Sequence, residues 1–280
     1  MASYKEMDGK RVLVTGAGTG IGRGVALEFA KEGADLVLHY WPSSEGAESA
    51  AQEIGNMGGK AKIVKADFRQ SEAIMHLAKE AIDFLGGLDV LVNNAGITVN
   101  MPFEETTLEV FDTLYHVNIR GQYFLTQAVV PTMEKQGKGI VINLASNHAF
   151  LGMTEHSVYA GTKGAIVAYT REVALELIHK GIRVNAIAPG WILVESHREV
   201  LGDGFDYESA AKGIPTGFIG TPRDVGRLAL FLASEESRYL VGQTIIFDGG
   251  EGCIMQGTGD IRERRKERYG VHYVEGLAKR

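Results

Sequence analysis

Short β-branched runs alternate with longer helical patterns along almost the whole chain, and this alternation constrains the fold more than any other feature. Strands are expected over 11–15, 36–40, 62–66, 88–93, 139–145, 183–188 and 244–248. Between them, apolar residues recur at helical spacing over 22–32, 44–57, 71–85, 107–135, 157–179 and 221–233. Repeated β-α-β units imply right-handed crossovers and a parallel sheet with helices on both faces. The sequence therefore predicts a single doubly wound α/β domain with about seven parallel strands.

Two segments interrupt this alternation and define the expected domain organisation. Residues 1–250 are expected to form the domain, and within it 192–217 is a long irregular stretch that is expected to act as a lid. Residues 251–280 follow the last strand as a C-terminal extension. They include the charge run 262–268, which is typical of a solvated helix face or of a tail that crosses a subunit boundary.

Composition and charge exclude several classes of protein. A net charge of −6 leaves no broad cationic surface for nucleic acid. The single cysteine, Cys253, excludes an internal disulfide framework, and no His, Asp and Glu cluster has metal-ligand spacing, so no metal is expected. No apolar run reaches the roughly 20 residues of a membrane span, and the N-terminus lacks the apolar core of a signal peptide. We therefore expect a cytoplasmic protein without nucleic-acid or membrane partners.

A glycine-rich turn follows the first expected strand. It reads T-G-A-G-T-G-I-G over 15–22 and leads into a helix. Glycine permits positive φ and lets an anion approach the backbone closely, and a helix N-terminus offers unpaired N–H groups with a partial positive charge. The turn therefore predicts a Rossmann-type site for the pyrophosphate of a dinucleotide, with a purely structural turn as the alternative.

A tyrosine and a lysine four residues apart indicate proton transfer. Tyr159 and Lys163 lie one turn apart on the same face of an expected helix. A phenol with a pKa near 10 is a poor base at neutral pH, but a neighbouring ammonium favours the phenolate. Ser146 follows a strand 13 residues before Tyr159, where its hydroxyl could hold a substrate oxygen. Hydride transfer to or from a nicotinamide needs such a proton donor or acceptor.

Taken in order, the glycine turn, Asn93-Asn94-Ala95-Gly96, Ser146 and the Tyr-x-x-x-Lys pattern resemble the short-chain dehydrogenase/reductase family over roughly residues 8–250. The resemblance implies an NAD(P)-dependent enzyme that transfers a hydride between nicotinamide and a secondary alcohol or carbonyl, or a sugar C1 hemiacetal. The catalytic residues that it implies are Asn118, Ser146, Tyr159 and Lys163. The cofactor-binding residues that it implies are Gly16, Thr19, Gly20, Ile21, Gly22, Tyr40, Asp67, Phe68, Asn94, Gly96, Tyr159, Lys163, Pro189, Gly190 and Ile192.

The family pattern also assigns individual roles and shows two departures. It implies that the Asn118 carbonyl holds a water linked to Lys163, and that Asp67 accepts a hydrogen bond from the adenine, unless Asp67 only caps a helix. Tyr40 stands where NAD-preferring members often have Asp, so a 2′-phosphate is not repelled; NADP or dual use is slightly favoured over NAD. Val194 stands where the family often has a Thr that bonds the carboxamide.

Polar residues around the expected site favour a polyhydroxylated small-molecule substrate. Asn147 and His148 follow Ser146, and the lid segment is also rich in polar residues. The residues expected to bind substrate are Ser146, His148, Tyr159, Trp191 and His197. His148 is read as a hydroxyl donor, with a surface-loop histidine as the alternative. Within the family, the chain looks most similar to sugar 1-dehydrogenases of the glucose-dehydrogenase type, which implies a sugar, sugar acid or polyol.

Two other functions and an assembly state complete the expectations. A 3-oxoacyl thioester reductase would use the same four catalytic residues. A non-catalytic NAD(P)-binding redox sensor has the same fold but commonly lacks the tyrosine or the lysine, both of which are present here. Similar proteins are usually homotetramers, and small residues on the expected 157–179 helix permit close helix packing, so a homotetramer is expected.

Overall fold

The computed structural model describes residues 4–195, 202 and 204–254. In these residues, seven parallel strands form one sheet with the order β3-β2-β1-β4-β5-β6-β7. The strands are β1 Arg11–Val14, β2 Asp35–Tyr40, β3 Ala61–Lys65, β4 Val90–Asn93, β5 Gly139–Leu144, β6 Ile182–Pro189 and β7 Thr244–Phe247. The helices discussed below are α1 Gly20–Lys31, α2 Glu45–Asn56, α3 Ser71–Leu85, α4 Leu108–Tyr115, α5 Gln122–Gln136, α6 Ser157–Leu177, α8 Tyr207–Lys212 and α9 Pro222–Ala233. The predicted doubly wound α/β fold is confirmed.

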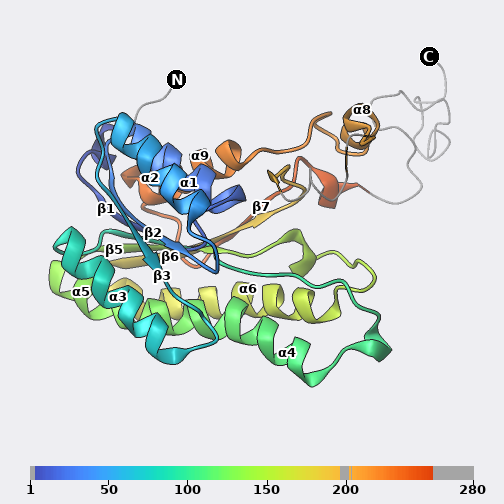
Figure 1. Ribbon diagram of the computed structural model, residues 1–280, viewed down its shortest axis with the longest axis horizontal. Coiled ribbons are helices and arrows are strands. Elements are labelled where there is room, and N and C mark those ends of the chain that lie inside the picture. The colour runs from blue at the N-terminus through green and yellow to red at the C-terminus, as the bar shows by residue number, and fades with distance from the viewer. Residues whose placement is uncertain (1–3, 196–201, 203, 255–280) are drawn as a thin grey trace, which may run out of the picture.

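Helices cover both faces of the sheet. Figure 1 shows α1, α2 and α9 on one face and α3, α5 and α6 on the other. Because side chains alternate along a strand, Val12 and Val14 enter the core under α1 and α9, whereas Leu13 enters the core on the opposite face. Burial on both faces explains why the strands read as continuous apolar runs. No described helix is both long and apolar enough to cross a membrane.

The strand order reverses at β1. The chain runs outward from β1 through β2 to β3, then returns to place β4 on the other side of β1, so that Val12 pairs with both Leu36 and Val90. The loops that leave β1 and β4 therefore diverge to opposite faces. This arrangement opens a crevice beyond the carboxyl ends of these strands, which is where parallel α/β sheets bind ligands.

The single long helix predicted over 107–135 is wrong in one respect. A π-helical turn, His116–Gly121, separates α4 from α5. The Asn118 side chain on this turn bonds away from the helix, to Ile97 and Thr162. Gly121 lies against Phe68, where an added Cβ would come within 2.3 Å of the phenylalanine ring. These contacts with distant residues accompany the wider π-helical turn. They leave no trace in the spacing of apolar residues, so the sequence pattern predicted one continuous helix.

The stretch predicted as irregular over 192–217 contains the short helix α8. Asp206 caps it by accepting a hydrogen bond from the Ser209 N–H at 3.0 Å. At the start of the stretch, Ile192 forms an isolated parallel bridge with Gly220. His197 and the charge run 262–268 lie outside the described residues.

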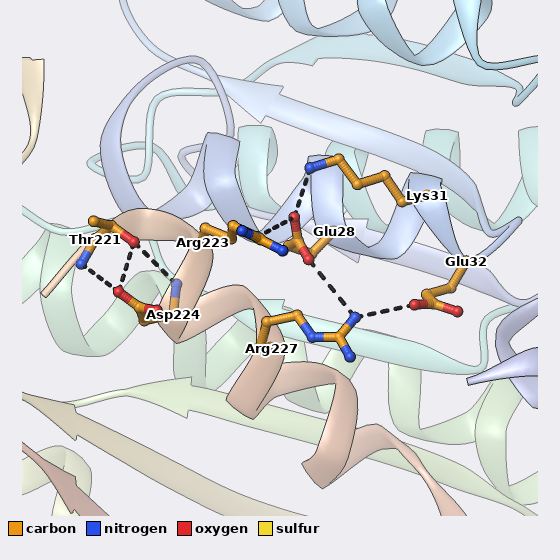
Figure 2. A network of polar contacts seen from close by, with 7 residues as sticks. All are labelled: Glu28, Lys31, Glu32, Thr221, Arg223, Asp224 and Arg227. Atoms are coloured by element: carbon orange, nitrogen blue, oxygen red, sulfur yellow. Dashed lines mark hydrogen bonds and ion pairs between the residues drawn. The ribbon is translucent and has the colours of Figure 1, made fainter. Parts of the chain in front are cut away.

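A charged network joins α1 to α9 (Figure 2). Close helix packing is possible because Gly24 has no side chain: an added Cβ would lie 2.4 Å from Pro222. Glu28 is only 3% exposed, and its carboxylate lies 2.6 Å from Lys31 Nζ, 3.6 Å from Arg223 and 3.8 Å from Arg227. The network fixes the helix that begins at the glycine-rich turn.

Candidate active site

A cleft of about 920 Å³ lies beyond the carboxyl ends of β1, β4, β5 and β6. Among the residues predicted to bind cofactor, those that line it are Gly16, Thr19, Gly20, Ile21, Asp67, Phe68, Asn94, Gly96, Tyr159, Lys163, Pro189, Gly190 and Ile192. Two predicted residues, Gly22 and Tyr40, are outside this lining. His39 and Trp41, the neighbours of Tyr40, line the cleft instead, because successive side chains point to opposite sides.

The glycine-rich turn forms a backbone cradle at the start of α1. Gly16 and Gly20 have positive φ angles of 62° and 54°. An added Cβ on Gly22 would come 2.1 Å from the Gly16 carbonyl oxygen, so Gly22 is needed to close the turn, not to touch a ligand. The Asn94 amide donates to the carbonyls of Thr15 (2.9 Å) and Gly16 (3.1 Å) and holds the turn against β4. A bare backbone at a helix N-terminus fits the pyrophosphate of a dinucleotide.

Aromatic and charged side chains line the far end of the cleft. The Asp67 carboxylate accepts hydrogen bonds from Arg69 Nε at 3.0 Å and Nη2 at 2.7 Å, and this contact lowers the Asp67 pKa. The α3 N-cap is Gln70, so the helix-cap alternative for Asp67 is wrong. His39 stacks on Phe68 at 4.5 Å and accepts the Gly16 N–H at 3.0 Å. Burial lowers the His39 pKa to about 4, so this ring is neutral at pH 7.

Tyr159 and Lys163 meet at the opposite end of the cleft. Lys163 Nζ lies 5.5 Å from the Tyr159 ring centroid and donates to the Leu144 carbonyl at 2.8 Å. Burial lowers the Lys163 pKa to about 8. Burial also raises the Tyr159 pKa, and this outweighs a hydrogen bond with Ser146 that lowers it. Without a bound cofactor, the Tyr159 pKa therefore does not fall as expected, because burial disfavours the charged phenolate more than the hydrogen bond favours it.

Asn118 is buried behind the cleft and organises its wall. Its side-chain oxygen accepts the Ile97 N–H at 2.8 Å, while its amide donates to the Ile97 carbonyl at 2.9 Å and to Thr162 Oγ1 at 3.1 Å. Its own carbonyl accepts a hydrogen bond from the Gln122 side chain. Gly96 lies close to this side chain, since an added Cβ would lie 3.3 Å from the Asn118 side-chain oxygen.

The wall beside Tyr159 is polar and includes residues that the sequence reasoning missed. Ser146 Oγ donates to Asn147 Oδ1 at 3.3 Å, and the Asn147 amide donates to Glu251 at 3.2 Å. The His148 ring lies 5.3 Å from that of Tyr159. Burial and His156, 5.0 Å away, lower its pKa, and its buried Nδ1 has no hydrogen-bond partner in the described residues.

Glu251 is a cleft residue that was not predicted from the sequence, and it lies 104 positions after its partner Asn147. Burial and the neighbouring Asp248 raise its pKa. Trp191, which was predicted to bind substrate, also lines the cleft, together with Met153 and His156. No local signal marks Glu251, because it follows the last strand and reaches the site only through the fold.

Comparisons with known proteins agree with this geometry. A family model described as enoyl-(acyl carrier protein) reductase matches residues 16–251. Hydroxynaphthalene reductase-like protein Arp2 of Metarhizium anisopliae is 37% identical over 266 residues, covering 89% of this chain and 99% of that protein. A 7α-hydroxysteroid dehydrogenase complexed with NADH and 7-oxo glycochenodeoxycholic acid has a TM-score of 0.82 at 34% identity, covering 89% and 98%. A short chain dehydrogenase from Burkholderia cenocepacia J2315 in complex with NADP has a TM-score of 0.80 at 30% identity, covering 88% and 98%.

Proposed function

Because the chain belongs to the short-chain dehydrogenase/reductase family and is an NAD(P)-dependent oxidoreductase of CH–OH groups, we propose that Tyr159 is its general acid and base. One observation carries this proposal: Tyr159 lines the cleft with Lys163 beside its ring and Ser146 at its hydroxyl. When bound, the nicotinamide supplies or takes up the hydride. Tyr159 gives a proton to the carbonyl oxygen in reduction and takes it from the hydroxyl in oxidation.

The other three predicted catalytic residues support Tyr159 in different ways. Ser146 holds the substrate oxygen against the phenol, since its hydroxyl lies in the same wall. Lys163 places a positive charge beside Tyr159 and presents its ammonium to the cleft. Asn118 positions Lys163 indirectly, because it ties the Ile97 loop to Thr162, the residue before the lysine.

The cleft binds the dinucleotide in three parts. The glycine turn and the α1 N-terminus hold the pyrophosphate, Asp67 and Phe68 flank the adenine, and the segment 189–192 flanks the nicotinamide. We favour NADP or dual use. In support, no carboxylate stands at Tyr40, and the guanidinium of Arg69 lines the adenosine end, 5.9 Å from the Trp41 ring.

The substrate proposed first is a sugar, sugar acid or polyol. Asn147, His148, His156 and Glu251 supply several hydrogen-bonding groups around the reacting position. The unpaired Nδ1 of His148 would gain a partner from a substrate hydroxyl, which removes the cost of leaving it unsatisfied. A wall of this kind favours substrates that carry hydroxyls next to the reacting carbon.

A second candidate substrate is a ring ketone or its alcohol. Met153 and Trp191 add apolar surface to the same wall, and proteins similar to this chain are named for hydroxynaphthalene and hydroxysteroid substrates. A 3-oxoacyl thioester is a third; the matching family model is described for a different reduction of an acyl-carrier-protein thioester, that of an enoyl group. A redox sensor that binds the dinucleotide without turnover is the alternative from another functional class, and the presence of both Tyr159 and Lys163 in the cleft argues against it.

Reduced-cofactor absorbance tests these proposals in both directions. NAD and NADP are assayed in parallel with aldoses, sugar acids and polyols for oxidation, and NADH and NADPH with a bicyclic ring ketone and a 3-oxoacyl thioester for reduction. Turnover with sugars supports the first candidate, and turnover only with ring ketones or thioesters rejects it. Tyr159→Phe is expected to lower kcat/KM about 10²–10⁴-fold. Tight cofactor binding without turnover in any assay would identify a sensor.

We also propose that the enzyme is a homotetramer. The helical face made by α4, α5 and α6 leaves large apolar side chains exposed, including Leu108 at 82% and Leu175 at 65%. Exposed large apolar side chains on helices of one face favour burial against another subunit. Light scattering at micromolar concentration should give four times the chain mass of 30.3 kDa. A monomeric mass would refute this assembly.

A further inference from the structure

A carboxylate from the far side of the cleft binds the backbone of the glycine-rich turn. Glu195 Oε2 accepts a hydrogen bond from the Gly20 N–H at 2.9 Å, across 175 positions of sequence. Both residues line the cleft. The preceding residue, Val194, packs on the same point, since an added Cβ on Gly20 would lie 3.2 Å from Val194 Cγ1. The segment after β6 therefore lies directly against the start of α1.

This position is favourable for any anion. Gly20 is the first residue of the 12-residue helix α1, where N–H groups lack intrahelical partners and the helix dipole is positive. The basic residue in the first turn, Arg23, does not supply a positive charge here, since it donates to Ser49 and Glu53 of α2. The N–H that Glu195 binds is thus one of the donors proposed above for the pyrophosphate.

A single N–H cannot donate at full strength to two anions, and two anions at hydrogen-bonding distance from it repel each other. We propose that Glu195 sets cofactor affinity by competing with the pyrophosphate for the Gly20 N–H. Binding is then weaker, and cofactor release faster, than the glycine turn alone would give. This inference rests on the proposed role of the turn in cofactor binding. Fast release matters in enzymes whose turnover is limited by product dissociation.

The test measures cofactor binding, without any substrate. Dissociation constants for NADH and NADPH are measured by fluorescence titration for the wild type, Glu195→Gln and Glu195→Ala. Removing the competing charge should tighten binding about two- to tenfold. Stopped-flow displacement should show correspondingly slower cofactor release. The matched control is Glu208→Gln on α8, which removes the same charge from an exposed residue outside the cleft lining.

Two smaller probes locate the effect at the phosphate. ADP, which carries a diphosphate, should bind more tightly to Glu195→Gln, whereas adenosine, which carries none, should bind equally to both proteins. Far-UV circular dichroism verifies that each variant is folded. Unchanged or weaker NADH and NADPH binding in Glu195→Gln, an equal gain in Glu208→Gln, or an equal gain for adenosine would each overturn the proposal. If neither wild type nor variants bind any dinucleotide, the proposed function fails as well, so the two failures are distinguishable.

Discussion

Glu28 provides a quantitative test of how α1 is held in place. Replacing it by Gln keeps the volume and removes the charge at the α1–α9 contact (Figure 2). The main loss is the acceptor charge in the 2.6 Å hydrogen bond from Lys31, since the 3.6 and 3.8 Å pairs with Arg223 and Arg227 are long. A charge-assisted hydrogen bond contributes about 1.5–3 kcal/mol when buried, and less here because Lys31 is 48% exposed.

Two features limit the loss further. Arg227 keeps its ion pair with Glu32 at 3.0 Å, so no cation is left buried without a carboxylate. The variant also avoids the cost of desolvating a carboxylate that is 3% exposed in the folded state. The net expectation is that Glu28→Gln lowers the free energy of unfolding by about 1–2 kcal/mol at pH 7.

Urea unfolding at fixed protein concentration measures this difference. The midpoint should fall while the slope with urea stays unchanged, because the surface exposed on unfolding is the same. Glu236→Gln, an exposed glutamate after α9, is the control and should change stability by less than about 0.5 kcal/mol. A Glu28→Gln variant as stable as the wild type, or more stable, would refute the reasoning that the buried pair with Lys31 contributes net stability.

Two further predictions concern the site and its turn. Because the pKa of Lys163 is lowered from 10.5 to about 8, the folded protein loses this proton at lower pH than the unfolded chain does. The free energy of unfolding of the wild type, relative to that of Lys163→Met, should therefore rise between pH 8 and 10.5, by about 3 kcal/mol at most. Urea titrations at each pH measure this difference. Gly22→Ala should lower the free energy of unfolding by about 1–3 kcal/mol and abolish NADH binding, because its methyl would lie 2.1 Å from the Gly16 carbonyl oxygen. The control, Gly55→Ala on α2, is exposed and would meet no atom within 4 Å, so it should raise the free energy of unfolding by up to about 1 kcal/mol. Equal stabilities of the two variants would contradict this assignment.

The seven strands and the glycine-rich turn could be predicted from the sequence because their signals are local. Each strand is a short apolar run, and the turn at 15–22 carries its glycines at fixed offsets. Residues whose structural role depends on their neighbours in sequence could therefore be predicted from the sequence.

The features that the sequence did not reveal all depend on contacts between distant segments. The π-helical turn at Asn118 is held by contacts with Ile97 and Thr162, which lie far away in the sequence. Glu195 and Glu251 enter the cleft from loops after β6 and β7, and both follow strands whose position is set by the whole sheet. Loop residues can vary without disturbing the sheet. Residues that select substrate and cofactor therefore lie in loops, where hydrophobic periodicity and motif spacing give the weakest signals.

The protonation states of Tyr159 and Lys163 indicate whether Tyr159 is a proton donor or a proton acceptor in the protein without cofactor. Burial raises the pKa of the phenol and lowers that of the ammonium to about 8, and both shifts favour the neutral form of each group. At pH 7 the phenol keeps its proton and Lys163 is largely charged. Tyr159 is therefore set as a proton donor, the form that carbonyl reduction requires. Oxidation requires the phenolate, so the same pair needs additional positive charge in the cleft to work in that direction.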